Sequence, residues 1–163
     1  MLSKTVLNAL NEQIQKEYYS SYLYLAMSAY CEANNLPGSA RWMRIQSQEE
    51  LSHAMKLFDC VSDRGGRVVL KAIAQPPTEY KSALDVFKKV LEHEKFVTAS
   101  IHKLYALSVK ENDYASQIVL QWFVTEQVEE EKNATQIVEQ LKTVGDSKTS
   151  IMLLDRHLAK RGA

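Results

Sequence analysis

Hydrophobic residues recur at intervals of three and four along most of this chain, which is the spacing of one face of an α-helix. Sustained apolar–polar alternation, the pattern of a half-buried strand, is rare. Only five Gly and three Pro interrupt the 163 residues. The pattern therefore predicts an all-α, single-domain chain (1–163), with helices over about 3–34, 39–64, 82–111, 114–144 and 147–160.

The breaks between these helices differ in length, and the difference predicts how the helices are connected. Residues 34–38 and 112–113 are short turns, so the helices on either side of each should form an antiparallel hairpin. Residues 67–81 show no helical period and are long enough to run the length of a bundle. Two hairpins joined by one long crossover predict a four-helix bundle. A short fifth helix should pack through Ile151, Leu154 and Leu158.

Polar side chains interrupt the hydrophobic stripe of each long helix near its midpoint. The six residues, in chain order, are Glu17, Glu50, His53, Glu94, Gln127 and Glu130. The interval from Glu17 to Glu50 equals that from Glu94 to Gln127, so the two hairpins resemble two copies of one half-site. Because the midpoints of antiparallel helices meet at one level, these side chains should converge in a single polar layer.

Four carboxylates in a dry core need a counter-charge, and no Lys or Arg lies on these stripes at that level. Two divalent cations would balance them, and Glu residues combined with a Glu-x-x-His helix form the di-iron carboxylate pattern. A core of protonated or water-linked carboxyls is the alternative. The second half-site carries Gln127 and Glu130 instead of Glu and His. An amide oxygen binds iron(II) less well than imidazole, so the second cation should be held more weakly.

Further residues beside the layer have two possible interpretations each. Glu49, Glu126 and Glu129 could complete a third, looser cation position or form a solvated acidic face. Tyr24 and Trp122 are close enough along their helices to relay electrons, but they could also be ordinary core aromatics. The remaining histidines have no carboxylate partner on a stripe and are interpreted as surface or packing residues: His93, His102 and His157.

Composition excludes some classes of function. The chain has 20 acidic and 20 basic residues, and this zero formal charge argues against nucleic acid as a partner. The uncharged run 18–31 is too short for a membrane span, and the N-terminal segment has no apolar signal core. Cys31 and Cys60 do not form a C-x-x-C pair and are expected to be reduced, as in a cytoplasmic protein.

Three segments, at residues 17–24, 48–55 and 122–131, strongly resemble the bacterial non-haem ferritins. The resemblance implies the ferritin-like fold and a ferroxidase centre with two irons. Glu17, Glu50 and His53 would bind the first iron. Glu94, Glu130 and a bridging Glu50 would bind the second, with Gln127 alongside. A third iron site would be formed by Glu49, Glu126, Glu129 and Glu130.

The same resemblance implies a function and an assembly. Iron(II) would be oxidised by dioxygen or hydrogen peroxide and stored as a ferric oxide-hydroxide mineral. The mineral would lie inside a hollow shell of twenty-four identical subunits, with the fifth helix around a four-fold axis. Haem is not expected, because Leu51 and Ser52 occupy the place where bacterioferritins have a haem-binding Met. A di-iron peroxidase or oxygenase that keeps its metals, and a non-enzymatic helical module with a vestigial site, are the alternatives.

Overall fold

The computed structural model describes residues 2–162, which fold into an all-α bundle without strands. The five helices are α1 (Lys4–Ala33), α2 (Pro37–Asp63), α3 (Ala83–Lys110), α4 (Tyr114–Val144) and α5 (Lys148–Leu158). These bounds lie within two residues of the expected ones. The largest difference at a helix start is in α2, which begins at Pro37 rather than Ser39. Proline suits the first helical position because its missing N–H would have no partner there.

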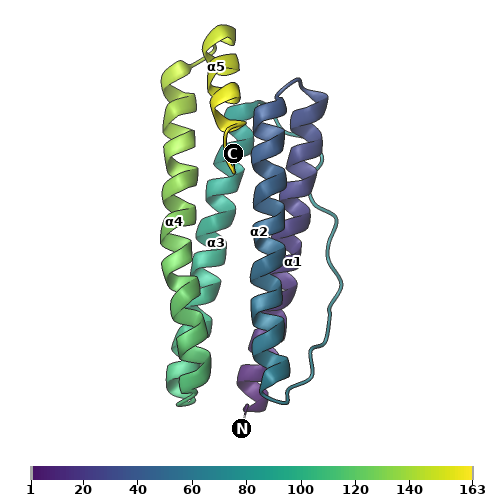
Figure 1. Cartoon of the computed structure of the whole chain (residues 1–163), viewed down its shortest axis with the longest axis vertical. Coiled ribbons are helices and arrows are strands. Elements are labelled where there is room, and N and C mark those ends of the chain that lie inside the picture. Colours follow the sequence, from purple (N-terminus) through teal and green to yellow (C-terminus); the bar gives the residue numbers. More distant parts are fainter. Residues whose placement is uncertain (1, 163) are drawn as a thin grey trace.

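The four long helices lie side by side as two hairpins, α1–α2 and α3–α4, and α5 lies at one end of the bundle (Figure 1). The crossover between α2 and α3 runs along the outside of α1. Hydrogen bonds fix it there: Asn11 donates to the carbonyl oxygen of Arg67 (3.2 Å) and accepts from the N–H of Val69 (2.9 Å). The Tyr30 hydroxyl donates to the carbonyl oxygen of Tyr80 (2.8 Å). The predicted connectivity of a four-helix bundle with one long crossover is confirmed.

Side-chain caps explain where four of the helices begin. Ser3, Ser82, Asp113 and Ser147 each accept a hydrogen bond from the backbone N–H three residues later. Such a cap satisfies one of the N–H groups that the first turn leaves without a partner. Arg64 at the end of α2 also donates to Asp113 (2.7 Å), so the start of α4 is tied to the first hairpin.

Two hydrophobic clusters form the core, one on each side of the polar layer. The cluster toward α5 is centred on Tyr24, Met27, Met43 and Phe87. The cluster toward the N-terminus is centred on Leu10, Ile14, Leu57, Ile101 and Phe123. Between them, all six predicted layer residues are buried, with exposed fractions of 1 to 4%. The layer is therefore closed to water along the bundle axis, which strengthens every electrostatic interaction within it.

A buried carboxylate fastens α5 to the start of α2. Asp155 accepts hydrogen bonds from the N–H of Gly38 (2.8 Å), the N–H of Ser39 (2.7 Å) and the Ser39 hydroxyl (2.7 Å). It thus caps a helix that Leu36 leaves without a side-chain cap. A Cβ atom on Gly38 would lie 1.7 Å from the backbone oxygen of Asp155, so only glycine permits this approach.

We expect Asp155→Ala to lower the free energy of unfolding by about 2 to 4 kcal/mol, because it leaves two buried N–H groups without an acceptor. Urea denaturation followed by circular dichroism measures this. Asp146→Ala, on an exposed residue of the α4–α5 loop, is the matched control and should change stability by less than about 0.5 kcal/mol. Equal effects of the two substitutions would show that the cap contributes nothing.

Candidate metal centre

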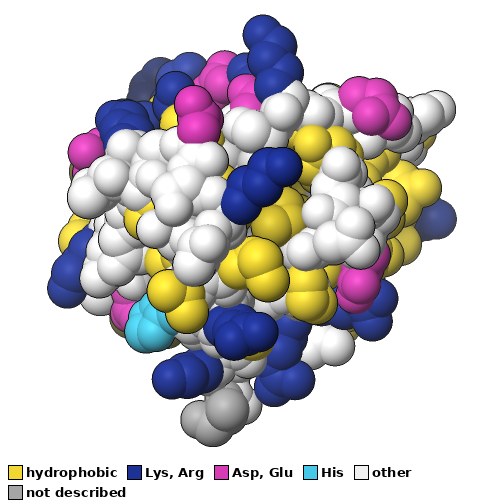
Figure 2. All heavy atoms as spheres, turned by 90° about the horizontal axis from the view of Figure 1, so that it is seen from above, with side chains coloured by type: hydrophobic (Ala, Val, Ile, Leu, Met, Phe, Trp, Pro, Cys, Tyr) yellow, Lys and Arg dark blue, Asp and Glu magenta, His cyan; other side chains and the backbone are white. Residues whose placement is uncertain are grey.

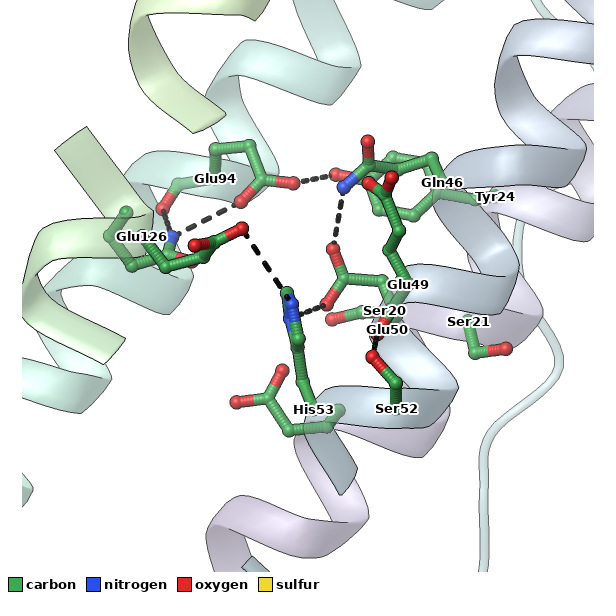
Figure 3. A network of polar contacts seen from close by, with 12 residues as sticks. Ser20, Ser21, Tyr24, Gln46, Glu49, Glu50, Ser52, His53, Glu94 and Glu126 are labelled. Carbon is green, nitrogen blue, oxygen red and sulfur yellow. Dashed lines mark hydrogen bonds and ion pairs between the residues drawn. The ribbon is translucent and has the colours of Figure 1, made fainter. Parts of the chain in front are cut away.

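In the first half of the layer, Glu50 and His53 of α2 lie next to each other (Figure 3), and Glu17 of α1 joins them. Their ligand atoms all lie within 4.8 Å of one another, and the three side chains are buried. The His53 Nδ1 atom lies 3.2 Å from an Oε atom of Glu50. The helical spacing of three residues predicted this pairing. Two carboxylates and one imidazole at these distances can bind a single divalent cation.

Two buried glutamines orient the carboxylates of this half. Gln13 donates to Glu17 and Gln46 donates to Glu50, each at 2.8 Å. Each glutamine lies four residues before its glutamate, so the pair faces one side of its helix. Gln13 was not among the predicted site residues, although its interval to Gln46 equals that from Glu17 to Glu50. The other oxygen of Glu17, Oε2, is buried without a hydrogen-bond partner, which leaves it available to a cation.

The second half is organised around Glu94 of α3. The Tyr24 hydroxyl donates to one carboxylate oxygen of Glu94, and Gln127 donates to the other (3.1 Å). Gln127 also donates to the Glu94 carbonyl oxygen and to the Thr98 hydroxyl, both at 3.2 Å. Gln127 therefore offers N–H groups rather than an oxygen toward Glu94. This arrangement is consistent with a second cation position that is weaker than the first.

A second group of possible ligands lies beside His53 on the side of α4. His53, Glu126 and Glu130 have ligand atoms within 4.8 Å of one another. The His53 Nε2 atom lies 4.0 Å from Glu126, so the imidazole stands between the two groups (Figure 3). Glu126 is only partly buried, with 28% of its side chain exposed. A cation bound here would be more accessible to water than one bound by Glu17 and Glu50.

Two residues that the sequence placed at a third position do not join this group. Glu129 is exposed on α4. Glu49 instead accepts a hydrogen bond from the Arg161 guanidinium, with Oε2 and Nη2 2.5 Å apart. No sequence pattern connects Arg161, which follows α5, with a glutamate near the middle of α2. The contact comes from the way α5 docks on the bundle.

Burial and mutual repulsion raise the pKa values of the layer carboxyls. The pKa rises to about 8 for Glu17, Glu50 and Glu94, chiefly because burial disfavours the charged form, and next because of a neighbouring glutamate. Burial and the charge of Glu94 raise the pKa of Glu130 to about 7, although the nearby Arg161 lowers it. Without a bound cation, the layer therefore retains protons at neutral pH.

Aromatic side chains surround the layer. Trp122 packs edge-on against His53, with ring centroids 5.3 Å apart, and Lys56 lies 4.2 Å from the Trp122 ring centroid. His93 packs against Tyr24 (5.8 Å) and hydrogen-bonds with Ser20 (2.7 Å). Burial lowers the pKa of His93 to about 4, so this ring is neutral. His93 has the packing role expected from the sequence.

Comparisons with known proteins show the family to which this chain is related. A family model described as a ferritin-like domain matches residues 7–144. A bacterial non-heme ferritin from Bacteroides fragilis is 42% identical over 99% of this chain and 100% of its own length. One from Campylobacter jejuni is 40% identical over 97% of this chain and 95% of its own length.

Solved structures give the same result. An open pore ferritin from the hyperthermophilic archaeon Archaeoglobus fulgidus superimposes with a TM-score of 0.98 at 49% identity, covering 99% of both chains. None of the helices within residues 2–162 is long and apolar enough to cross a membrane. The match of sequence, fold and full chain length shows that this protein belongs to the ferritin family.

Proposed function

We propose that this chain is the subunit of an iron-storage ferritin with ferroxidase activity, for which iron(II) is the substrate and iron(III) the stored product. The observation that carries the proposal is the buried layer itself. Within residues 2–162, none of its four carboxyls forms an ion pair with Lys or Arg, and His53 is the one basic side chain paired with it. Divalent cations can displace the protons that the layer retains and provide the counter-charge that the ionised carboxylates then need. The non-heme ferritins among the relatives support iron as that cation.

The two halves of the layer have unequal roles in this proposal. Glu17, Glu50 and His53 bind the first iron. Glu94, Glu130 and Glu50 bind the second, with Gln127 beside it. Because Gln127 points its N–H groups at Glu94, the second iron has fewer strong ligands and leaves more readily. An unequal pair of positions suits iron in transit to a store better than a permanently bound pair.

The chemistry proceeds as an electron transfer from two substrate ions to one oxidant. Two iron(II) ions give one electron each to dioxygen, which takes up two protons and leaves as hydrogen peroxide. Hydrogen peroxide in turn accepts two electrons and two protons and gives two waters. The layer carboxyls retain protons before iron binds, so iron displaces protons there. The Tyr24 hydroxyl donates to Glu94, where an oxidisable phenol can relay an electron from an iron(II) ion to the oxidant and return to its reduced form.

Iron(III) leaves the layer through the more accessible position of His53, Glu126 and Glu130, with Glu49 and Glu129 as further carboxylates along the way. It then joins a ferric oxide-hydroxide mineral inside a shell of twenty-four copies of this chain. Iron, dioxygen or hydrogen peroxide and other copies of the chain are thus its partners, and haem has no part in the reaction. The two free cysteines, Cys31 and Cys60, fit a cytoplasmic location.

The end of the molecule that carries α5 supports assembly. Met152 and Leu153 of α5 are exposed by 57% and 60%. Figure 2 looks onto this end and shows hydrophobic side chains grouped near the middle, with Lys and Arg around them. An apolar group surrounded by charges is typical of a surface that another chain covers. In the proposed shell, α5 contacts its copies around the four-fold axis.

The test is the amount of iron retained after stepwise addition of iron(II) in air, measured on protein isolated by gel filtration. We expect a large particle that holds far more iron than the two or three ions its layer can bind. Retention that stops at about two ions per chain, as in a fixed di-iron bundle, would contradict storage and indicate a peroxidase or oxygenase. No oxidation at all would leave only a structural role.

A further inference from the structure

Arg161, which follows α5, is held against the bundle by two contacts. Its Nη2 atom donates to Glu49, and its guanidinium carbon lies 4.2 Å from the ring centroid of Trp42. Trp42 is itself buried against Phe87, with ring centroids 5.3 Å apart. The guanidinium is thus held between a carboxylate and an aromatic face, and only 20% of the side chain is exposed. These two contacts together offset the side-chain entropy that is lost when the guanidinium is held in one place.

Glu49 is the residue that this contact controls. It lies four residues before His53 on α2, so the two side chains share one face of the helix, one turn apart. His53 in turn belongs to the group with Glu126 and Glu130. This spacing makes Glu49 a neighbour of His53 on the helix surface, from which its carboxylate could serve a cation bound by that group. In the structure the carboxylate is instead paired with Arg161.

We propose that Arg161 is a positioning residue that withholds Glu49 from the third cation position. A cation that binds beside His53, Glu126 and Glu130 gains Glu49 as a ligand only when the Glu49–Arg161 ion pair breaks. The ion pair thereby lowers the affinity of the third position for a cation and shortens the time that an iron ion stays bound there. This inference rests on the proposed function, because it concerns the residence of the same substrate ion.

The experiment titrates the metal-free assembled protein with zinc(II), and with iron(II) under argon, by isothermal calorimetry. Arg161→Gln removes the competing charge, and we expect about tenfold tighter binding at the third position, which is about 1.4 kcal/mol. Binding at the first position should stay unchanged, and the second position is evaluated separately because it shares Glu130, on which the charge of Arg161 also acts. Arg161→Lys keeps the charge and should bind close to the original protein. Arg156→Gln, which removes the same charge from an exposed position on α5, is the matched control.

A double-mutant cycle with Glu49→Gln separates release of this ligand from a general change of charge. Most of the tenfold gain should be lost when Arg161→Gln is made in the Glu49→Gln protein, and the remainder comes from the charge of Arg161 on Glu130. A full tenfold gain there, a gain of equal size in Arg156→Gln, or no gain in Arg161→Gln would each overturn the inference. Fewer than two bound ions in the unchanged protein would instead contradict the proposed function, so the two failures are distinguishable.

Discussion

Glu50→Ala should slow the oxidation of iron(II) at least about 100-fold. Glu50 lies between the two halves of the layer, since its charge acts on both Glu17 and Glu94 and one of its oxygens lies 3.2 Å from His53. In the function proposed above, its loss would remove a ligand from both iron positions at once. Even residues that only orient a metal ligand contribute about 10- to 100-fold. The initial growth of iron(III) absorbance in air, at two iron(II) per chain, measures the rate.

His53→Ala provides an independent test of the same assignment. It removes the one imidazole of the layer and should also reduce the rate, while Glu50 and Glu94 remain. Glu139→Ala, on an exposed glutamate of α4 whose partner is Lys142, is the matched control and should oxidise iron at the original rate. A normal rate in His53→Ala would refute the placement of the first iron.

The sequence predicted the parts of this fold that depend on local spacing. The period of three and four residues gave the long helices, and Ser82 and Asp113 marked two of their starts. The expectation that antiparallel helices meet at their midpoints predicted one polar layer. All six of its residues are buried: Glu17, Glu50, His53, Glu94, Gln127 and Glu130. This worked because antiparallel helices joined by short turns must align their midpoints, whatever the details of packing.

The features that the sequence did not predict all depend on contacts between distant segments. Asp155 caps α2 across more than a hundred residues of chain, and its charge on α5 looks like any exposed helix residue in the sequence. The pairing of Arg161 with Glu49 depends on the same docking of α5. From the sequence, Glu49 was expected among the residues of a third cation position. In the structure it is paired with Arg161 instead. Gln13 had a local signal, its position four residues before Glu17, but a glutamine is not by itself a ligand.

The metal-free protein should lose stability as pH rises from about 5 to 8. Folding raises the pKa of Glu17, Glu50 and Glu94 from 4.5 to about 8, so the folded state binds more protons than the unfolded state between these values. The resulting stabilisation is complete below about pH 4.5 and is lost as pH rises through about 8. Each such carboxyl contributes a slope of about 1.4 kcal/mol per pH unit where only the folded state retains its proton.

The thermal midpoint of the metal-free protein, followed across this pH range, measures the effect. Glu50→Gln removes one titrating group and lessens the repulsion on Glu17 and Glu94, so its midpoint should fall less steeply and lie above that of the original protein at pH 8. Glu139→Gln should follow the original curve, because Glu139 is exposed in the folded state. Zinc(II) should reverse the pH dependence of the midpoint, because it binds the deprotonated carboxylates and fewer protons compete with it as pH rises.

A midpoint that rises between pH 5 and 8 without metal would mean that the layer is already charged and balanced by other groups. The carboxyls would then have no need of a cation, and the central argument for a metal centre would be lost.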